Sequence, residues 1–190
     1  NINWNTFKGH FCSNDDCNCT STTHTQLAEM FRQIGKEVDM TYTPTGSGAY
    51  DSYAASYLSR LGFSHTGLIN YNANTAINSL GSGEIIYIAG TDSNDGRHAW
   101  VLDGYKEIVS TTKFYTRPAG QLEWTLIRTT TSTGEYFHFN WGWDGDSNGY
   151  FSNDAVVFNT AHPSDLDDNV SNYADYDFSS SVKIIANISH

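Results

Sequence analysis

Two short stretches of the chain combine a histidine, an asparagine and several tryptophans in apolar, strand-like surroundings. In the first stretch His98 begins an apolar run, and in the second Asn140 ends one. Trp141 and Trp143 follow Asn140 closely. An imidazole that is held by an amide and shielded by an indole is how cysteine and serine hydrolases build a general base. The two stretches therefore predict hydrolytic chemistry at His98.

His98 is the candidate base because an imidazole with a pKa of about 6.5 can take up and return a proton near neutrality. A single histidine in an apolar strand is more often a hydrogen-bonded core residue. The sequence Asn140-Trp141-Gly142 nearby favours the catalytic interpretation. The side-chain oxygen of Asn140 can accept from one ring nitrogen and leave the other to face a thiol, while Trp141 covers that hydrogen bond from water.

A further polar group, Asp144, Asp146 and Asn148, has the D-x-D-x-N spacing of some calcium-binding loops. An EF-hand loop needs a glutamate at its twelfth position, which is Ala155 here. We therefore expect a tight turn, with calcium only as a weak candidate. No other metal and no cofactor are expected.

The three cysteines, Cys12, Cys17 and Cys19, lie close together in a polar segment. An odd number leaves at least one thiol unpaired within the chain. A local disulfide, reduced thiols, or a zinc site completed by His10 or His24 are all compatible with this spacing.

The composition excludes several classes of partner. Lys and Arg number 10 against 21 Asp and Glu, a formal net charge of −11, and no basic run is present. This charge argues against nucleic acid and against docking on anionic lipid. No apolar run approaches the roughly 20 residues that span a bilayer. The low charged fraction of 16% suits an extracellular protein.

The elements that must position these residues are predicted as helices first and strands afterwards. Amphipathic helices are predicted from a cap at 22–25 to Gly35, from Tyr50 to Leu61 and from Asn72 to Leu80, with a turn-rich loop at 43–48. Strands are predicted at 85–89, 99–103, 124–130, 136–141 and 182–188. This order predicts an α+β protein, and we expect residues 1–190 to form a single domain piece.

One hairpin register would bring the two candidate residues together. If the tip of the hairpin lies at 117–121, Gly104 faces Gly134 and His98 faces Asn140. Directly opposed residues share a face, with Cβ atoms about 5 Å apart. A hairpin offset by one residue would place the two side chains on opposite faces.

Three motifs resemble the streptopain family of bacterial papain-like cysteine peptidases. They are Gly-x-His-Ala-Trp-Val-Leu-Asp-Gly-Tyr at 96–105, Phe-His-Phe-Asn-Trp-Gly-Trp-x-Gly-x-Ser-x-Gly-Tyr-Phe at 137–151, and Gly-Lys-Glu-Val-Asp-Met-x-Tyr-x-Pro-x-Gly-Ser-Gly-Ala-Tyr at 35–50. The likeness extends over most of residues 24–160. It implies a papain-like fold in which helices precede an antiparallel sheet or half-barrel with a long hairpin. It also implies endopeptidase activity on protein or peptide substrates, in a secreted or cell-envelope bacterial protein activated from a zymogen.

The resemblance also assigns roles to single residues. His98 matches the family's catalytic histidine, and Asn140 matches the residue that orients it. The substrate cleft is expected beside Trp141 and Trp143, with Gly96 and Ala99 from the first motif also at the cleft.

The chain departs from the family's pattern in three respects. Asp144 stands where a glycine is usual, and the segment 106–133 is longer than in a typical member. The family's nucleophile lies in a Gly-Cys-Val-Ala-type segment that is absent from these 190 residues. We therefore expect a second polypeptide of a processed two-chain enzyme to supply the cysteine. Cys19, placed before a helix whose N-terminus would lower its pKa, is the alternative within the chain. The alternative function is a non-catalytic binding or adhesion module that retains the fold.

Overall fold

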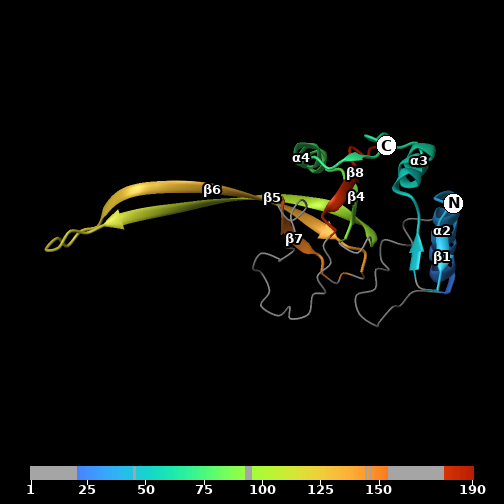
Figure 1. Ribbon diagram of the computed structural model, residues 1–190, viewed down its shortest axis with the longest axis horizontal. Coiled ribbons are helices and arrows are strands. Elements are labelled where there is room, and N and C mark those ends of the chain that lie inside the picture. Colours follow the sequence, from blue (N-terminus) through green and yellow to red (C-terminus); the bar gives the residue numbers. More distant parts are fainter. Residues whose placement is uncertain (1–20, 45, 93–95, 144, 146, 154–177) are drawn as a thin grey trace. The chain divides into compact units, whose positions relative to one another are not determined.

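The computed structural model describes residues 21–44, 46–92, 96–143, 145, 147–153 and 178–190. The chain divides into two compact units, Asn1–Leu61 and Gly62–His190. The described residues combine three helices with a two-stranded and a six-stranded antiparallel sheet (Figure 1). The protein is therefore α+β, as predicted, and consistent with a papain-like fold.

The first unit contains α2 (Ser21–Glu37), β1 (Thr41–Thr43), β2 (Gly46–Gly48) and α3 (Asp51–Arg60). The predicted turn-rich loop at 43–48 is in fact part of a small hairpin, in which β1 pairs with β2. The predicted second helix is confirmed as α3, which the positive φ of Gly62 (90°) follows.

The first predicted helix runs two residues past its expected end at Gly35. The chain reverses instead at Asp39, which has a φ of 52°, and the Met40 N–H donates to the Gly35 carbonyl at 2.8 Å. A Cβ at residue 35 would collide with the hydroxyl of Tyr42. Gly35 is therefore explained by this close approach rather than by the end of the helix.

The second unit is built on the six-stranded sheet, with strand order β3-β8-β4-β5-β6-β7 and every neighbouring pair antiparallel. The elements are β3 (Ile69–Asn70), α4 (Ala73–Gly81), β4 (Ile86–Thr91), β5 (Arg97–Thr116), β6 (Thr125–Asn140), β7 (Gly149–Ser152) and β8 (Ser180–Ile185). The predicted third helix is confirmed as α4, whose N-cap Asn72 accepts from the Thr75 N–H at 3.0 Å.

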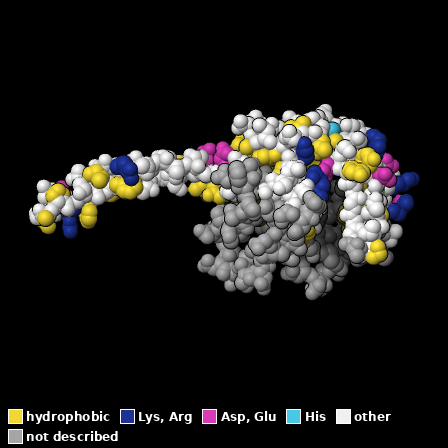
Figure 2. Space-filling model, viewed as in Figure 1, with side chains coloured by type: hydrophobic (Ala, Val, Ile, Leu, Met, Phe, Trp, Pro, Cys, Tyr) yellow, Lys and Arg dark blue, Asp and Glu magenta, His cyan; other side chains and the backbone are white. Residues whose placement is uncertain are grey.

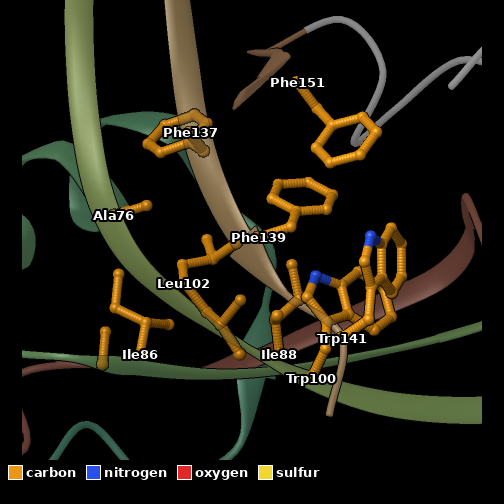
Figure 3. Close-up of a cluster of buried hydrophobic side chains, with 11 residues drawn as sticks. Ala76, Ile86, Ile88, Trp100, Leu102, Phe137, Phe139, Trp141 and Phe151 are labelled. Carbon is orange, nitrogen blue, oxygen red and sulfur yellow. The ribbon is translucent and has the colours of Figure 1, made fainter. Parts of the chain in front are cut away.

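The core lies on one face of this sheet (Figure 3). Burial alternates along the strands, so that Trp100 and Leu102 of β5 and Phe137 and Phe139 of β6 point into the core. The other buried members of this cluster are Ala76, Ile86, Ile88, Trp141, Phe151, Ile184 and Ala186. Even-numbered residues of β5 up to Leu102 therefore share a face with odd-numbered residues at the end of β6.

The predicted register of the long hairpin is wrong. Asn140 lies opposite Val101, three residues further along β5 than His98, and Gly104 lies opposite His138. The difference arises at the tip, where Thr116 lies opposite Thr125 rather than Leu122. The two register shifts, between Phe114 and Tyr115 and between Leu102 and Gly104, are opposite in sense and cancel by Val101. Because an offset of three is odd, His98 lies on the core face, whereas Asn140 lies on the other face.

Candidate active site

His98 lies near the start of β5, where that strand pairs with β4. The residue opposite His98 in β4 is Gly90. A Cβ at Gly90 would collide with the backbone carbonyl of Phe178, so the glycine lets the chain at Phe178 pass close to the sheet. The ring of Phe178 in turn lies 5.3 Å from the ring of His98, measured between centroids.

Four aromatic rings surround the imidazole. Their centroids lie between 4.9 and 6.2 Å from that of His98, and they belong to Trp100, Trp141, Trp143 and Phe178. Trp141 and Trp143 stack on each other, with an interplanar angle of 10°. The imidazole is half-buried among these apolar surfaces. They limit the access of water to the ring.

One ring nitrogen of His98 is held by the backbone. Its Nε2 lies 2.9 Å from the carbonyl oxygen of Trp141. A carbonyl only accepts hydrogen bonds, so Nε2 carries the proton and donates it. In the neutral ring Nδ1 is then the unprotonated nitrogen, which is the state that a general base requires.

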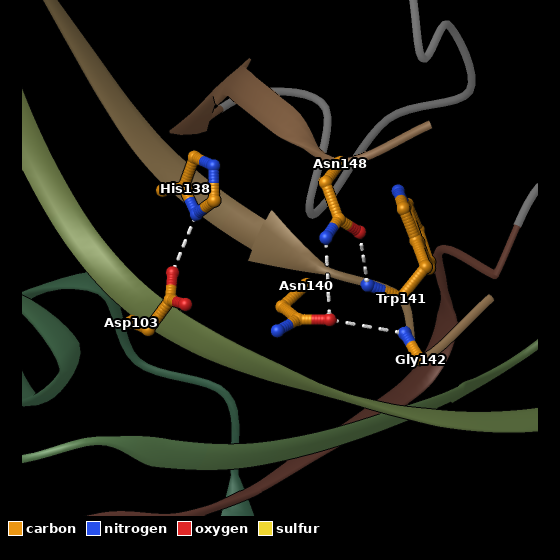
Figure 4. A network of polar contacts seen from close by, with 6 residues as sticks. All are labelled: Asp103, His138, Asn140, Trp141, Gly142 and Asn148. Atoms are coloured by element: carbon orange, nitrogen blue, oxygen red, sulfur yellow. Dashed lines mark hydrogen bonds and ion pairs between the residues drawn. The ribbon is translucent and has the colours of Figure 1, made fainter. Parts of the chain in front are cut away.

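A network of side-chain amides holds this carbonyl in place (Figure 4). The Trp141 N–H donates to Oδ1 of Asn148 at 2.9 Å, and Nδ2 of Asn148 donates to Oδ1 of Asn140 at 3.3 Å. The same oxygen of Asn140 accepts from the Gly142 N–H at 3.2 Å. Gly142 has a φ of 77°, which favours glycine. Asn140 and Asn148 together fix the backbone on both sides of the Trp141 carbonyl.

The direct hydrogen bond expected between Asn140 and the His98 ring is not among the hydrogen bonds of the described residues. The register explains why, since the two side chains lie on opposite faces of the sheet. Asn140 is linked to the ring through the turn that carries Trp141.

The two other residues predicted at the cleft lie beside His98 in the chain. The Gly96 N–H donates to Oδ1 of Asp92, and the Asp92 N–H donates to the Gly96 carbonyl, both at 2.7 Å. Gly96 thus fixes the start of β5. Ala99 is exposed on the face opposite to His98.

The weak calcium candidate is only partly described. Asp144 and Asp146 lie outside the described residues, and the Asn148 amide makes the two hydrogen bonds given above. Within the described part of the chain, no group of three or more His, Cys, Asp or Glu side chains could hold a metal ion. The zinc alternative also falls outside it, because the cysteines lie in residues 1–20 and the side chain of His24 is not described.

Two contributors to the surroundings of His98 are not predicted by the sequence. Asn148 was expected only as a weak calcium ligand, although its closeness to Asn140 in the sequence was a usable signal. Phe178 lies far from the motifs in sequence, and nothing local points to it. A separate pair lies on the opposite face of the sheet, where Nδ1 of His138 is 2.5 Å from Oδ1 of Asp103 and the His138 ring packs edge-on against Tyr150.

An imidazole that one backbone carbonyl orients, set among indoles on an antiparallel sheet, is the arrangement that the general base of a nucleophilic hydrolase needs. The sequence model of the peptidase C10 family matches residues 1–151, and the chain belongs to this family, the streptopain family of cysteine peptidases, as predicted. The chain is thus a cysteine peptidase of the streptopain type. A search of curated proteins finds no significant match. No helix in the described residues is long and apolar enough to cross a membrane.

Proposed function

We propose that this protein is a cysteine endopeptidase in which His98 is the catalytic base and the Trp141 carbonyl orients its ring. The observation that carries the proposal is the 2.9 Å contact between Nε2 of His98 and that carbonyl. The contact selects the tautomer with an unprotonated Nδ1, which is the nitrogen that must face a thiol.

In the proposed mechanism, Nδ1 of His98 takes the proton of a cysteine thiol. The resulting thiolate attacks the carbonyl carbon of the scissile peptide bond, and hydrogen-bond donors stabilise the oxyanion. The imidazolium then gives its proton to the leaving amine as the C–N bond breaks. Water next attacks the acyl-enzyme, with His98 accepting its proton, and the thiolate leaves and is reprotonated.

The thiol is proposed to come from a second polypeptide of a processed enzyme. In support, α2, the helix that follows Cys19, resembles the family segment that comes after the nucleophile helix, so Cys19 does not lie where the family's nucleophile lies. Cys19 is the alternative within the chain. The proposed function also includes activation from a zymogen, protein or peptide substrates, and a secreted or cell-envelope location in a bacterium.

The source of the thiol can be tested by labelling the native preparation with an epoxysuccinyl inhibitor that alkylates peptidase thiolates. Denaturing electrophoresis and peptide mass spectrometry then identify the labelled polypeptide. Label on a separate, smaller polypeptide supports the two-chain proposal, and label on Cys19 contradicts it. A preparation that takes up no label and cleaves no protein favours the binding or adhesion module instead.

The role of the histidine is tested by His98→Ala in the native preparation. General acid–base catalysis contributes roughly 10²- to 10⁴-fold, so we expect kcat/KM for peptide hydrolysis to fall by at least that much while the fold is retained. His138→Gln is the matched control, since this second histidine lies on the opposite face of the sheet and should keep most of the activity. Normal hydrolysis by His98→Ala would show that the assignment is wrong.

A further inference from the structure

The long hairpin extends beyond the rest of the sheet as a two-stranded arm (Figure 1). Strand β4 pairs with β5 only as far as Leu102, and β7 pairs with β6 only from Phe139 to Tyr136. From Glu107 and Glu135 outward, β5 and β6 pair only with each other among the described strands. We call residues 107–135 the arm.

The middle of the arm is made almost entirely of hydroxyl side chains. Residues 110–112 and 129–133 are all serine or threonine. Residues 110–112 pair with 130–132 across the arm, whereas Thr129 and Thr133 pair with Lys113 and Val109. Threonine is β-branched and favours extended backbone, and its hydroxyl tolerates water. This part of the arm, the shaft, can therefore remain exposed on both faces.

The far end of the arm, residues 113–128, has a different character, and we call it the head. It carries large apolar side chains that no core covers, with Leu122 90% exposed and Trp124 and Ile127 each 62% exposed. Phe114, Tyr115 and Leu126 are also exposed. Figure 2 shows hydrophobic and basic side chains gathered toward this end of the arm. Exposed apolar surface of this kind marks an interaction site.

The charge of the head is opposite to that of the rest of the chain. Lys113, Arg117 and Arg128 stand against the single acid Glu123, a net charge of +2. The chain as a whole carries −11, so the remaining residues carry −13 (−11 minus +2).

Two of the cations lie directly over aromatic rings. The guanidinium carbon of Arg117 is 5.0 Å from the ring centroid of Trp124, and that of Arg128 is 4.1 Å from that of Phe114. Cation and apolar ring are thus presented together, as at the interface of a membrane, where the ring enters the apolar boundary and the cation meets phosphate.

The exposed apolar side chains of the head are spread over both strands and the tip of the arm. They are Phe114 and Tyr115 of β5, Leu126 and Ile127 of β6, and Leu122 and Trp124 between the strands. A flat protein surface would cover only part of this set, whereas a fluid lipid interface entered tip-first surrounds the whole head. Among the described strands, the outer edges of β5 and β6 in the arm have no pairing partner, which limits entry to the interfacial layer.

We propose that the head is a membrane-docking element that inserts shallowly into a bilayer containing anionic phospholipid. The shaft separates the basic head from the acidic remainder of the protein, so that docking on anionic lipid is compatible with the negative net charge. The seven-residue rise from Glu107 to Phe114 corresponds to about 23 Å, beyond the Debye length of about 8 Å at physiological salt. The expectation drawn from net charge, that anionic lipid repels this chain, therefore does not apply to the head.

The test is co-sedimentation of the full-length protein with vesicles of phosphatidylcholine and phosphatidylglycerol, compared with vesicles of phosphatidylcholine alone. The wild-type protein should bind the anionic vesicles and bind less as salt is added. Lys113→Gln combined with Arg117→Gln should lower the partition coefficient about 30-fold. Leu122→Ser combined with Trp124→Ser should lower it at least about tenfold.

The matched control changes the shaft, with Thr111→Ser and Thr131→Ser, and should bind like the wild type. Unchanged circular dichroism and Tm establish that each variant is folded. The proposal is overturned if wild-type protein ignores anionic vesicles or if the head variants bind them equally well. Concentration-dependent self-association that the head variants lose, without vesicle binding, would also overturn it and identify a second copy as the occupant. Because binding is measured without peptide hydrolysis, this result is independent of the role of His98.

Discussion

At the scale of single residues, the unusual feature of the site is that a backbone carbonyl orients the imidazole. The carbonyl of Trp141 has no rotamers and does not titrate, so its position depends only on the turn that carries it. That turn is held by the amides of Asn140 and Asn148. We therefore propose that these two asparagines act on His98 as positioning residues, through the turn and not through a hydrogen bond to its ring.

We expect Asn148→Ala to lower kcat roughly 10- to 100-fold with little change in KM, because a small displacement of the Trp141 carbonyl misaligns the base. Asn148→Asp keeps the oxygen that accepts from the Trp141 N–H and should recover part of kcat. Steady-state kinetics on one peptide substrate measures both values. A rise in KM at unchanged kcat would instead assign Asn148 to substrate binding.

Most of the aromatic site could be predicted from sequence, since His98, Trp141 and Trp143 lie in two short motifs and do come together. The contact with Asn140 could not. It depended on the position of the hairpin tip, and turn residues at 117–121 do not reveal that the strands end at Thr116 and Thr125. Phe178 was beyond reach because only the tertiary structure brings it to β5.

At the scale of elements, the long hairpin that the sequence analysis expected is present as β5 and β6. Its continuity did not come from periodicity, because the strands predicted at 99–103, 124–130 and 136–141 are only parts of these two long strands. Serine and threonine in the shaft lack the apolar alternation that indicates a half-buried strand, so this part left no pattern. The two- and four-residue strands β3 and β7 were missed because they are too short for any periodicity.

One half-buried phenol, that of Tyr71, links the segment before α4 to the far edge of the sheet. The Tyr71 hydroxyl donates to Oδ1 of Asn153 at 2.8 Å, and Nδ2 of Asn153 donates to Oε2 of Glu135 at 3.2 Å. Burial, followed by the charge of Glu135, raises the pKa of Tyr71 above its ordinary value. The folded protein therefore keeps this proton at a pH where the unfolded chain has lost it.

This linkage gives a prediction with a definite sign. The contribution of Tyr71 to stability is fully present below about pH 10, the unfolded pKa, and is lost as the pH rises from there toward the folded pKa. Tyr71→Phe should lower the free energy of unfolding by about 1 kcal/mol at neutral pH. Above about pH 10, the free energy of unfolding of this variant should fall less steeply with pH than that of the wild type. Urea unfolding across alkaline pH measures this, with Tyr115→Phe on the exposed arm as the control. Equal alkaline slopes for Tyr71→Phe and the wild type would contradict it.

At the scale of the whole molecule, the proposed catalysis and the proposed docking use separate parts of one hairpin. The base of β5 and the end of β6 carry His98 and the Trp141 turn, whereas the arm carries no member of the buried core. An isolated two-stranded ribbon is at best marginally stable in water, so the arm adds little to the free energy of folding. The arm is therefore explained better by what its head can bind than by a structural role.

This separation predicts that the arm can be removed. Replacing residues 109–133 with Asn-Gly closes a tight hairpin at the Ile108–Gly134 pair. The unfolding free energy should change by less than about 1 kcal/mol, since no buried core residue is lost. Hydrolysis of a short soluble peptide by the native assembly should keep the wild-type kcat/KM, and binding to anionic vesicles should disappear. The deletion leaves the aromatic surroundings of His98 intact. A loss of peptide hydrolysis together with vesicle binding, at unchanged Tm, would therefore contradict this separation and assign the arm to the catalytic apparatus.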